Sequence, residues 1–378
     1  MFEKHSISNA KLKVMHITYD MRIGGTETVI KNIINGSDKN KYDMSILCIE
    51  SPLGPFAQQL QNEGVQFFEL NRRPGFDTTL IKSIRNIIQC NNIDIVHCHQ
   101  YTPWVYGVIA SAFSKAKVIF TEHGRFYPDF STRKRQLVNP LLNLFTDQVT
   151  AISNATKQAL VKFENIREKS IDVIYNGIIP PDIDQAEVER LRKALNLNQE
   201  QLILGTIARF DPIKNHTMML KAFAEVLTHH PNTLLIIVGD GEERKNIETC
   251  IQSLNITENV ILTGYQVNAQ SYLALMDIYL LSSFSEGTSM TLLEAMALSK
   301  PCVVTNVGGN PEVIKDKFNG FVTGNDNAAE FASAILKLMQ EDIRATQSKN
   351  ALKNFNAAFT AASMNAQYAK VYSAIKPH

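Results

Sequence analysis

The chain has 378 residues, of which 44% are hydrophobic and 20% are charged, and its formal net charge is +1. This length is too great for one ordinary domain and allows two sizeable cores. The near balance of charge provides no global field of the kind that marks a nucleic-acid binder. The 5 cysteines include no C-x-x-C pair, which argues against a disulfide framework and a zinc knuckle and favours a reducing compartment.

Neither a signal peptide nor a membrane span is predicted. Residues 1–6 lack the apolar core of a signal peptide. The longest stretch without an acidic or basic residue, 95–114, contains His97, His99 and Pro103, which make it unsuitable as a transmembrane helix. We therefore expect a cytoplasmic protein, whose membrane contact would be at the inner face.

Short β-rich runs alternate with helical patterns, which is typical of parallel sheets wrapped by helices. The first series of expected strands covers residues 13–19, 43–49, 65–70, 94–99, 117–122, 148–152 and 171–175. The second series covers residues 202–208, 233–238, 260–263, 277–281 and 301–305. Beyond Gly320 we expect helices only. The predicted fold class is α/β, with two Rossmann-like, doubly wound domains that face each other across a cleft.

The glycine and the paired prolines of segment 176–182 are typical of a linker. We predict an N-terminal domain over residues 1–180 and a C-terminal domain over 181–355. A final helix, about 356–375 within the last segment 356–378, is expected to pack back toward the N-terminal domain. In doubly wound sheets ligands bind beyond the carboxyl ends of the strands, so polar residues at strand ends are the candidates for a site.

The most specific pattern is segment 286–294, EGTSMTLLE, around the start of a helix expected over 288–299. Free backbone amides at a helix start suit an anionic diphosphate. Glu286 and Glu294 are far enough apart to accept hydrogen bonds from sugar hydroxyls on either side of that diphosphate. The segment therefore predicts a nucleotide-sugar site. The alternative is a helix with an acidic first turn and one solvated glutamate.

Two cations, Arg209 and Lys214, follow the expected strand 202–208, and no other Lys or Arg lies between Lys193 and Lys221. Arginine can bind a diphosphate with two parallel hydrogen bonds, while lysine supplies a mobile point charge. Together they would neutralise a departing nucleotide. The alternative is a surface salt-bridged pair.

Candidates in the first half of the chain also follow strands. Gly24 and Gly25 would allow positive φ and close approach of the backbone to a ligand, although a generic tight turn explains them equally well. His123 ends the strand 117–122 and is either a site residue or a structural histidine. His97 and His99 share one face of a strand, but in the absence of a third convincing ligand we predict no metal site.

Basic residues and aromatic residues alternate beyond the strand 117–122. The basic ones, Arg125, Arg133, Lys134 and Arg135, precede an apolar segment over 137–145. This arrangement predicts contact with an anionic lipid-linked acceptor or a membrane surface. The alternative is a solvated helix start beside a buried apolar face.

Taken together, the patterns resemble a known family over nearly the whole chain. The residues that carry the resemblance are Gly24 to Glu27, His123-Gly124, Asn176-Gly177, Arg209 with Lys214, and Glu286 through Glu294. They are similar to the group-1 family of retaining GT-B glycosyltransferases. The resemblance implies a nucleotide diphosphate sugar as co-substrate, bound mainly by the C-terminal domain. It also implies an acceptor at the N-terminal domain, and neither a cofactor nor a metal.

The resemblance further implies roles for individual residues. Arg209 and Lys214 would hold the pyrophosphate, and the amides of Ser289, Met290 and Thr291 would hold the distal phosphate. Glu294 would bind the ribose, and Glu286 and Gly287 would bind the donor sugar. Gly264 and Tyr265 would contact the base. Gly24 and Gly25 would approach the phosphate and the sugar, and His123 would border the reacting sugar, so that Glu286, His123, Arg209 and Lys214 form the catalytic set. One departure is Thr288-Ser289, where many relatives have Phe-Gly.

The expected activity is transfer of a sugar from a UDP- or GDP-sugar to a hydroxyl of a glycan or lipid-linked acceptor. The resemblance also implies that the anomeric configuration is retained and that no metal is needed. It implies a place in bacterial-type surface polysaccharide or glycoconjugate synthesis. No nucleic-acid partner is expected. The alternatives are a GT-B sugar-nucleotide epimerase or phosphorylase, or a catalytically silent nucleotide-sugar-binding protein.

Overall fold

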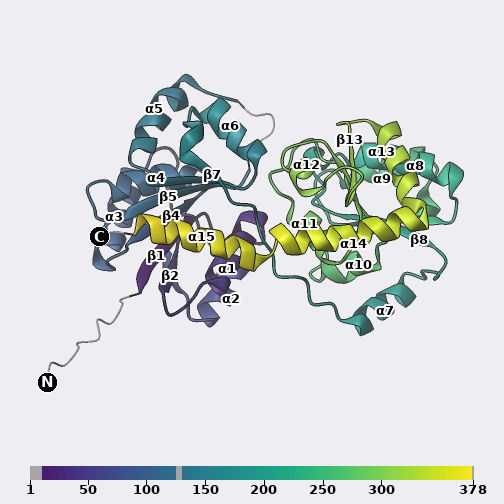
Figure 1. Cartoon of the computed structure of the whole chain (residues 1–378), viewed down its shortest axis with the longest axis horizontal. Helices are drawn as coiled ribbons and strands as arrows, with labels where there is room; N and C mark the ends of the chain where they lie inside the picture. Colours follow the sequence, from purple (N-terminus) through teal and green to yellow (C-terminus); the bar gives the residue numbers. More distant parts are fainter. Residues whose placement is uncertain (1–10, 125–129, 377–378) are drawn as a thin grey trace. The chain divides into compact units, whose positions relative to one another are not determined.

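The computed structural model of the chain describes residues 11–124 and 130–376. It consists of two compact units, one made of Met1–Gly177 with Ala361–His378 and the other of Ile178–Thr360. Each unit holds one parallel sheet covered by helices, as Figure 1 shows. The helix at the end of the chain is therefore part of the first unit.

The first unit alternates strands and helices along the chain. Its elements are β1 (Leu12–Thr18), α1 (Gly25–Gly36), β2 (Tyr42–Cys48), α2 (Pro55–Asn62), β3 (Gln66–Glu69), α3 (Thr78–Cys90), β4 (Ile95–His99), α4 (Tyr101–Ser111), β5 (Lys117–Glu122), α5 (Arg133–Leu144), β6 (Gln148–Ala151), α6 (Asn154–Glu164), the 3-10 helix η1 (Glu168–Ser170), β7 (Ile171–Val173) and α15 (Ala361–Ile375).

The first sheet is 7-stranded, in the order β3-β2-β1-β4-β5-β6-β7. Its central strands are buried on both faces because helices cover both sides of a parallel sheet. Trp104 on α4 stacks on Phe120 of β5 with their ring centroids 4.4 Å apart, and both side chains are fully buried. Helix starts are fixed by side chains that accept backbone N–H groups, Asp77 for α3 and Ser153 for α6.

The second unit repeats the same alternation. Its elements are α7 (Gln185–Ala194), β8 (Leu202–Ile207), the 3-10 helix η2 (Pro212–Lys214), α8 (His216–His229), β9 (Thr233–Val238), α9 (Arg244–Ser253), the 3-10 helix η3 (Thr257–Asn259), β10 (Val260–Gly264), α10 (Ala269–Leu275), β11 (Ile278–Leu281), α11 (Met290–Ala297), β12 (Cys302–Thr305), α12 (Asn310–Val313), β13 (Gly320–Thr323), α13 (Ala328–Met339) and α14 (Glu341–Ala358).

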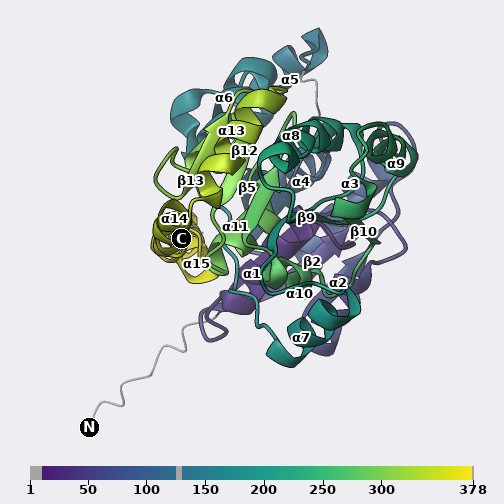
Figure 2. The same cartoon turned by 90° about the vertical axis from the view of Figure 1, so that its right-hand side faces the viewer.

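The second sheet is 6-stranded, in the order β10-β9-β8-β11-β12-β13. Strand β9, with the sequence TLLIIV, is buried at every position, which is typical of a central strand in a parallel sheet. Helices α8 and α13 pack side by side, as both Figure 1 and Figure 2 show. The strand order reverses between β8 and β11, and in such sheets this reversal point is where ligands bind.

Two expectations for the C-terminal third of the chain were wrong. A further strand, β13, follows Gly320 and pairs with β12 from Cys302 to Thr305. The last predicted helix, 356–375, is divided: α14 ends at Ala358 and α15 begins at Ala361. Between them Thr360 forms an isolated bridge with Ile178, so the backbone here pairs instead of continuing the helix.

Among the described residues, none of the helices has both the length and the hydropathy that a bilayer span requires.

Helix α15 contributes a hydrogen bond to the buried middle of the first sheet. The hydroxyl of Tyr372 lies 2.9 Å from Nδ1 of His97, which is fully buried on β4. The Tyr372→Phe variant deletes this partner and leaves a buried ring nitrogen unsatisfied, so we expect a loss of about 1 to 3 kcal/mol in the free energy of unfolding. Urea unfolding followed by the fluorescence of Trp104, the single tryptophan, reports on the first unit alone.

The matched control is Tyr175→Phe, which removes a hydroxyl whose bond to Asn154 lies at the surface. We expect it to change the stability by no more than about 0.5 kcal/mol. Equal midpoints for the two variants would contradict a structural role of the Tyr372 hydroxyl.

Candidate active site

The C-terminal candidates lie at the carboxyl ends of β8 and β11, the neighbouring strands at the reversal of the second sheet. Arg209 and Lys214 follow β8, and Glu286 follows β11. Hydrogen bonds tie the two loops together. Phe284 N donates to the carbonyl of Ile213 at 2.7 Å, and the Ser282 hydroxyl donates to the carbonyl of Lys214 at 2.8 Å. The topology therefore brings together residues that are more than 70 positions apart in the sequence.

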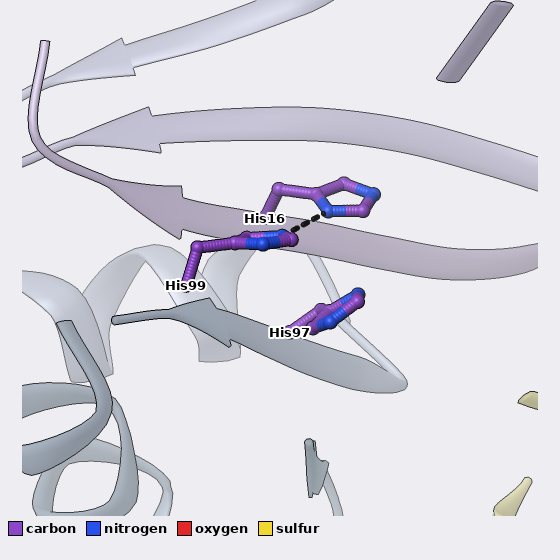
Figure 3. A group of neighbouring side chains, drawn as sticks. All are labelled: His16, His97 and His99. Carbon is purple, nitrogen blue, oxygen red and sulfur yellow. Dashed lines mark hydrogen bonds between the residues drawn. The ribbon is translucent and has the colours of Figure 1, made fainter. Parts of the chain in front are cut away.

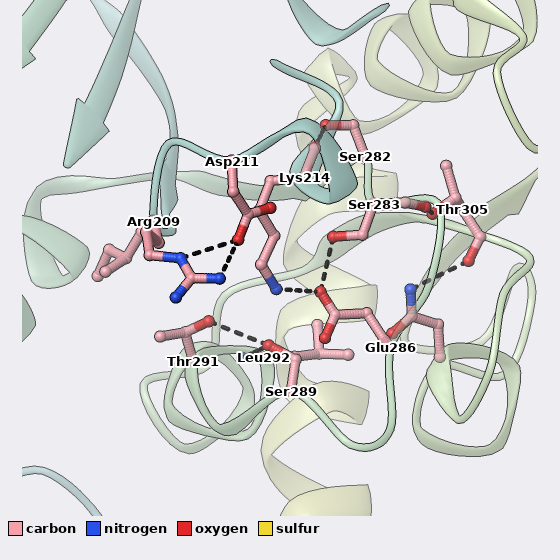
Figure 4. Close-up of polar contacts among 12 residues, drawn as sticks. Arg209, Asp211, Lys214, Ser282, Ser283, Glu286, Ser289, Thr291, Leu292 and Thr305 are labelled. Carbon is pink, nitrogen blue, oxygen red and sulfur yellow. Dashed lines mark hydrogen bonds and ion pairs between the residues drawn. The ribbon is translucent and has the colours of Figure 1, made fainter. Parts of the chain in front are cut away.

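The centre of this site is an ion pair between Lys214 and Glu286, shown in Figure 4. Lys214 Nζ lies 2.6 Å from Glu286 Oε1, and the hydroxyl of Ser283 donates to the same oxygen at 2.6 Å. The Glu286 side chain is only 9% exposed and that of Lys214 is 24% exposed. Charge-assisted hydrogen bonds of this kind hold both side chains in one orientation. Glu286 Oε2 has no hydrogen bond within the described part of the chain, which leaves it to accept from a ligand hydroxyl.

Arg209 forms a second ion pair, with Asp211. Its Nε and Nη2 atoms lie 2.9 and 2.6 Å from Asp211 Oδ2, and its side chain is 76% exposed. The bond orients the guanidinium, while Nη1 is not engaged by any residue that the structure describes. Both cations of the site are therefore paired with acids: Lys214 with Glu286, which was predicted as a site residue, and Arg209 with Asp211, which the sequence analysis did not include.

The loop after β12 packs closely against the loop that carries Glu286. Gly308 has φ of 49°, and a Cβ atom added there would overlap the carbonyl oxygen of Glu286. The neighbouring Gly309 N donates to the carbonyl of Gly287 at 3.0 Å. Only glycine permits this close approach. The loop after β12 therefore fixes the backbone position of Glu286 and Gly287.

Helix α11 begins at Met290, two residues later than predicted, and Ser289 is its N-cap. The hydroxyl of Ser289 accepts from Leu292 N at 3.3 Å. The Thr291 hydroxyl lies 2.7 Å from the hydroxyl of Tyr279, which anchors the helix start to β11. The start of α11 thus has a fixed direction, and a helix N-terminus is the end that favours an anion.

Glu294 lies one turn into α11 and is mostly buried. Burial raises the pKa of its carboxyl group, and a hydrogen bond from Gln270, at 3.4 Å, opposes this effect. Gly264 is the last residue of β10 and has φ of 71°, and Tyr265, which follows it, is 63% exposed. The structure therefore gathers Lys214, Glu286 and the start of α11, and among the described residues no hydrogen bond or ion pair joins Gly264 or Tyr265 to them.

Gly24 and Gly25 follow β1 in the first unit, but the expected positive φ was wrong. Gly24 is the N-cap of α1 with φ of −164°, which is ordinary extended backbone. In this loop the left-handed residue is Met21, with φ of 59°. A Cβ atom at Gly24 would meet only the carboxylate of Glu27, the movable end of a side chain in the same helix start. Burial raises the pKa of that carboxyl group.

His123 is partly buried and contacts a cluster of buried histidines on β1 and β4. Its Nε2 lies 2.8 Å from His99 Nδ1, and His99 Nε2 lies 2.9 Å from His16 Nδ1. His16 is in register with His97 across β1 and β4. The sequence analysis missed His16, because its proximity depends on β1 pairing with β4 and no local pattern reports that.

His16, His97 and His99 could in principle be metal ligands, since their ligand nitrogens lie within 4.8 Å of one another (Figure 3). The third ligand that the sequence did not provide is thus present. However, His16 and His99 face each other through a shared hydrogen bond, and His97 is bound by Tyr372 at 2.9 Å and by Thr121 at 2.7 Å. A zinc ion would need these lone pairs directed at itself, at about 2.0 Å. The geometry is that of a hydrogen-bond network, and independence of metal stays a prediction.

The basic segment divides into two parts. Arg135 is held by buried Glu164 at 3.1 Å and lies over the ring of Tyr101, and its contact with an acceptor stays a prediction. Arg133 and Lys134 are exposed at the start of α5. Arg125 lies outside the described residues.

The alternative reading of this segment, a buried apolar face on α5, was wrong. Only one of its large apolar residues, Leu142, is buried. The exposed ones are Leu137 (74%), Leu141 (60%), Leu144 (69%) and the C-cap Phe145 (57%).

Comparison with known proteins agrees with this architecture. The family model described as Glycosyltransferase Family 4 matches residues 23–180, and the model described as Glycosyl transferases group 1 matches residues 187–355. Two parallel Rossmann-like sheets of this kind define the GT-B fold. The chain belongs to the group-1 glycosyltransferases.

Curated relatives match most of the chain. It is 25% identical over 363 residues to the Escherichia coli UDP-Gal:alpha-D-GlcNAc-diphosphoundecaprenol alpha-1,3-galactosyltransferase, covering 91% of this chain and 92% of the relative. It is 28% identical over 318 residues to the N-acetyl-alpha-D-glucosaminyl L-malate synthase of Bacillus anthracis, covering 82% of each.

Solved structures share the fold at lower identity. A glycosyltransferase from Rickettsia africae superimposes with a TM-score of 0.84 at 21% identity, covering 97% of this chain and 99% of that one. The Anabaena protein HepE in complex with UDP and glucose gives a TM-score of 0.82 at 23% identity, covering 96% and 99%.

The raised pKa of Glu294 leads to a prediction about stability and binding. A carboxylate whose pKa is higher in the folded chain destabilises the fold above its unfolded pKa of about 4.3, and the penalty disappears below that pH. The Glu294→Gln variant should therefore unfold at a higher temperature than wild type at pH 8, and at the same temperature near pH 4. Thermal unfolding at both pH values measures this difference.

If Glu294 accepts ligand hydroxyls, the same variant should bind UDP about tenfold to hundredfold more weakly, because a hydrogen bond to a charged group contributes about 1.5 to 3 kcal/mol. Glu258→Gln, at an exposed position of the same unit, is the control for both measurements. Unchanged UDP affinity in the Glu294 variant would remove this residue from the site.

Proposed function

We propose that the chain is a retaining transferase that moves a hexosyl unit from a UDP-hexose to a hydroxyl of a lipid-diphosphate-linked glycan, in surface polysaccharide or glycoconjugate synthesis. The observation that carries the proposal is the pair of Lys214 and Glu286 next to the start of α11. The names of relatives support the substrate class: the Escherichia coli enzyme uses UDP-Gal and a diphosphoundecaprenol acceptor, and the Anabaena structure contains UDP.

The charges of the site suit this chemistry. When the bond between the anomeric carbon and the β-phosphate oxygen breaks, negative charge develops on the leaving diphosphate. Lys214, Arg209 and the first amides of α11 would stabilise that charge. Glu286 would accept hydroxyls of the transferred sugar through Oε2 and hold Lys214 through Oε1. The basic side chains and the acid therefore serve opposite ends of one ligand.

Retention follows if the acceptor attacks on the face from which the diphosphate leaves. The acceptor oxygen then forms the new bond to the anomeric carbon, and its proton passes to the leaving phosphate oxygen. No protein base and no metal is required for this step, because side-chain cations and helix amides stabilise the negative charge that develops on the leaving diphosphate. We propose a metal-independent reaction for this reason.

The test is turnover with UDP-hexoses and a synthetic lipid-diphosphate-linked acceptor, with EDTA present. Lys214→Met removes one stabilising cation, so we expect a 100- to 1,000-fold lower kcat. Lys245→Met, at an exposed position of the same unit, should leave kcat within twofold. The coupling constant of the anomeric proton in the product reports its configuration, and we expect it to match that of the donor.

Other outcomes would identify the alternatives. An inverted product, or activity lost in EDTA and restored by a divalent cation, would contradict the proposed mechanism. Conversion of the donor to a free isomer without acceptor would mark an epimerase. A thermal shift with UDP-hexose but no turnover on any acceptor would indicate a silent binding protein. A shift with GDP-sugars alone would indicate that the donor is a GDP-sugar and not a UDP-sugar.

We also propose that the first unit binds the membrane surface through α5, at its inner face, where a lipid-linked acceptor resides. Leu137, Leu141 and Leu144 are spaced at helical intervals and are all exposed, so they form one apolar stripe. Arg133 and Lys134 start the same helix. Near this stripe, Phe113 is 99% exposed and lines one shallow pocket with Leu144 and Phe145. Apolar residues beside cations are what an anionic bilayer surface attracts.

Vesicle sedimentation tests this surface. The triple variant Leu137→Ser, Leu141→Ser, Leu144→Ser should bind vesicles of phosphatidylcholine and phosphatidylglycerol at least about tenfold more weakly than wild type, since each leucine contributes about 1.5 to 3 kcal/mol on burial. Arg133→Ser with Lys134→Ser should weaken binding only when phosphatidylglycerol is present. The control is Val267→Ser, which changes an exposed apolar residue of the second unit. Equal binding by all variants would discard the membrane surface.

A further inference from the structure

Gln100 is the single residue that joins β4 to α4 in the first unit. Strand β4 ends at His99, and α4 begins at Tyr101. The backbone of Gln100 has φ of 71° and ψ of 169°, a combination that is essentially restricted to glycine. A Cβ atom in this conformation crowds the neighbouring backbone, so a glutamine is held here under strain.

The backbone of Gln100 cannot relax, because both of its polar groups are engaged. Its N–H donates to the carbonyl of Thr121 at 2.9 Å and so continues the ladder between β4 and β5. Its carbonyl accepts from Trp104 N at 3.2 Å, which is the first bond of α4. Glycine would make the same two hydrogen bonds in the same conformation without strain.

The side chain of Gln100 does not contribute to the fold. Gln100 is the N-cap of α4, but its side chain makes no capping hydrogen bond. Its Oε1 atom is buried without a partner, and neither Oε1 nor Nε2 forms a hydrogen bond with any described residue. A buried carbonyl oxygen without a donor is destabilising. Glutamine therefore disturbs the fold twice at a position that glycine would fill without either penalty.

Gln100 lies where a sheet of this kind binds ligands. The strand order of the first sheet reverses between β1 and β4, and ligands bind at the carboxyl ends of the strands at such a reversal. Tyr19, directly after β1, hydrogen-bonds the side chain of Thr102 in the first turn of α4, so the two strand ends adjoin. A sharp, strained turn from strand to helix is also how α/β-hydrolases present a side chain above the sheet. Violated local preferences at such a place indicate function.

We propose that Gln100 is an acceptor-binding residue, whose side-chain amide forms hydrogen bonds with hydroxyls of the acceptor glycan at the carboxyl end of β4. An amide accepts through Oε1 and donates through Nε2, and adjacent sugar hydroxyls can match both. The terminal torsion of glutamine is soft, so a turn of the amide brings Oε1 to a hydroxyl. The inference rests on the proposed function for the identity of the ligand, and it deepens that function by naming a residue that recognises the acceptor.

Two variants separate the backbone strain from the amide. Gln100→Ala keeps a Cβ atom in the strained conformation, Gln100→Gly removes it, and both remove the amide. Urea unfolding followed by the fluorescence of Trp104 should therefore give a higher midpoint for Gln100→Gly than for Gln100→Ala. A midpoint of the glycine variant equal to or below that of the alanine variant would show an unstrained backbone and overturn the proposal.

Both variants should also lose acceptor recognition. The acceptor is a synthetic hexose linked through a diphosphate to a short alkyl chain. We expect its KM to rise about tenfold, since hydrogen bonds to the amide are lost, while the KM for UDP-hexose changes less than about twofold. Gln61→Ala, at an exposed position of the same unit, is the control. A merely structural role would move the urea midpoint alone, so an unchanged acceptor KM would contradict the proposal.

Calorimetric titration of the same acceptor into the full chain, without UDP-hexose, keeps this inference apart from the proposed function. Wild type should bind the acceptor, and both Gln100 variants should bind it about tenfold more weakly. If this loss is found but wild type transfers no sugar, the proposed function fails and the acceptor contact stands. If sugar is transferred and all variants bind the acceptor equally, the acceptor contact fails and the proposed function stands.

Discussion

The ion pair between Lys214 and Glu286 is the contact on which the candidate donor site depends. It joins the loop after β8 to the loop after β11, and Ser283 adds a second hydrogen bond to the same carboxylate oxygen. A mostly buried pair of this kind offers little net stability, because desolvation of the two charges offsets their attraction. The ion pair instead holds both side chains in a fixed orientation. The lysine can serve a phosphate only from a fixed position, and the glutamate supplies that position while it keeps Oε2 for a sugar hydroxyl.

The parallel topology explains how this pair forms. Strands β8 and β11 are neighbours at the reversal of strand order, so their carboxyl ends lie side by side although Lys214 and Glu286 are 72 residues apart. The same principle acts in the first unit, where β1, β4 and β5 bring His16, His99 and His123 into one row. In both sheets these side chains lie on buried strands or on the short loops that follow them, and the strands fix their positions.

Much of this arrangement could be predicted from the sequence. The strands β5 and β9 have the predicted bounds, because buried runs of β-branched and aromatic residues are strong local signals. Strand β13 was missed because a strand of 4 residues that begins with a glycine gives almost no periodicity. Glu286 was predicted as a site residue, but its pairing with Lys214 was not, because that proximity follows from strand order, and Asp211 was not predicted at all. His16 was not predicted for the same reason, and the extended φ of Gly24 shows that this glycine pair does not mark a left-handed turn.

The central claim is that the second unit holds a diphosphate between Lys214, Arg209 and the start of α11, with acids on either side of it. A crystal structure of the chain in complex with UDP tests it most directly. We predict phosphate oxygens within hydrogen-bond distance of Lys214 Nζ, of Arg209 and of an amide at the start of α11, with the ribose at Glu294. A diphosphate bound elsewhere in the chain, with the Lys214 and Glu286 pair facing solvent, would contradict this account.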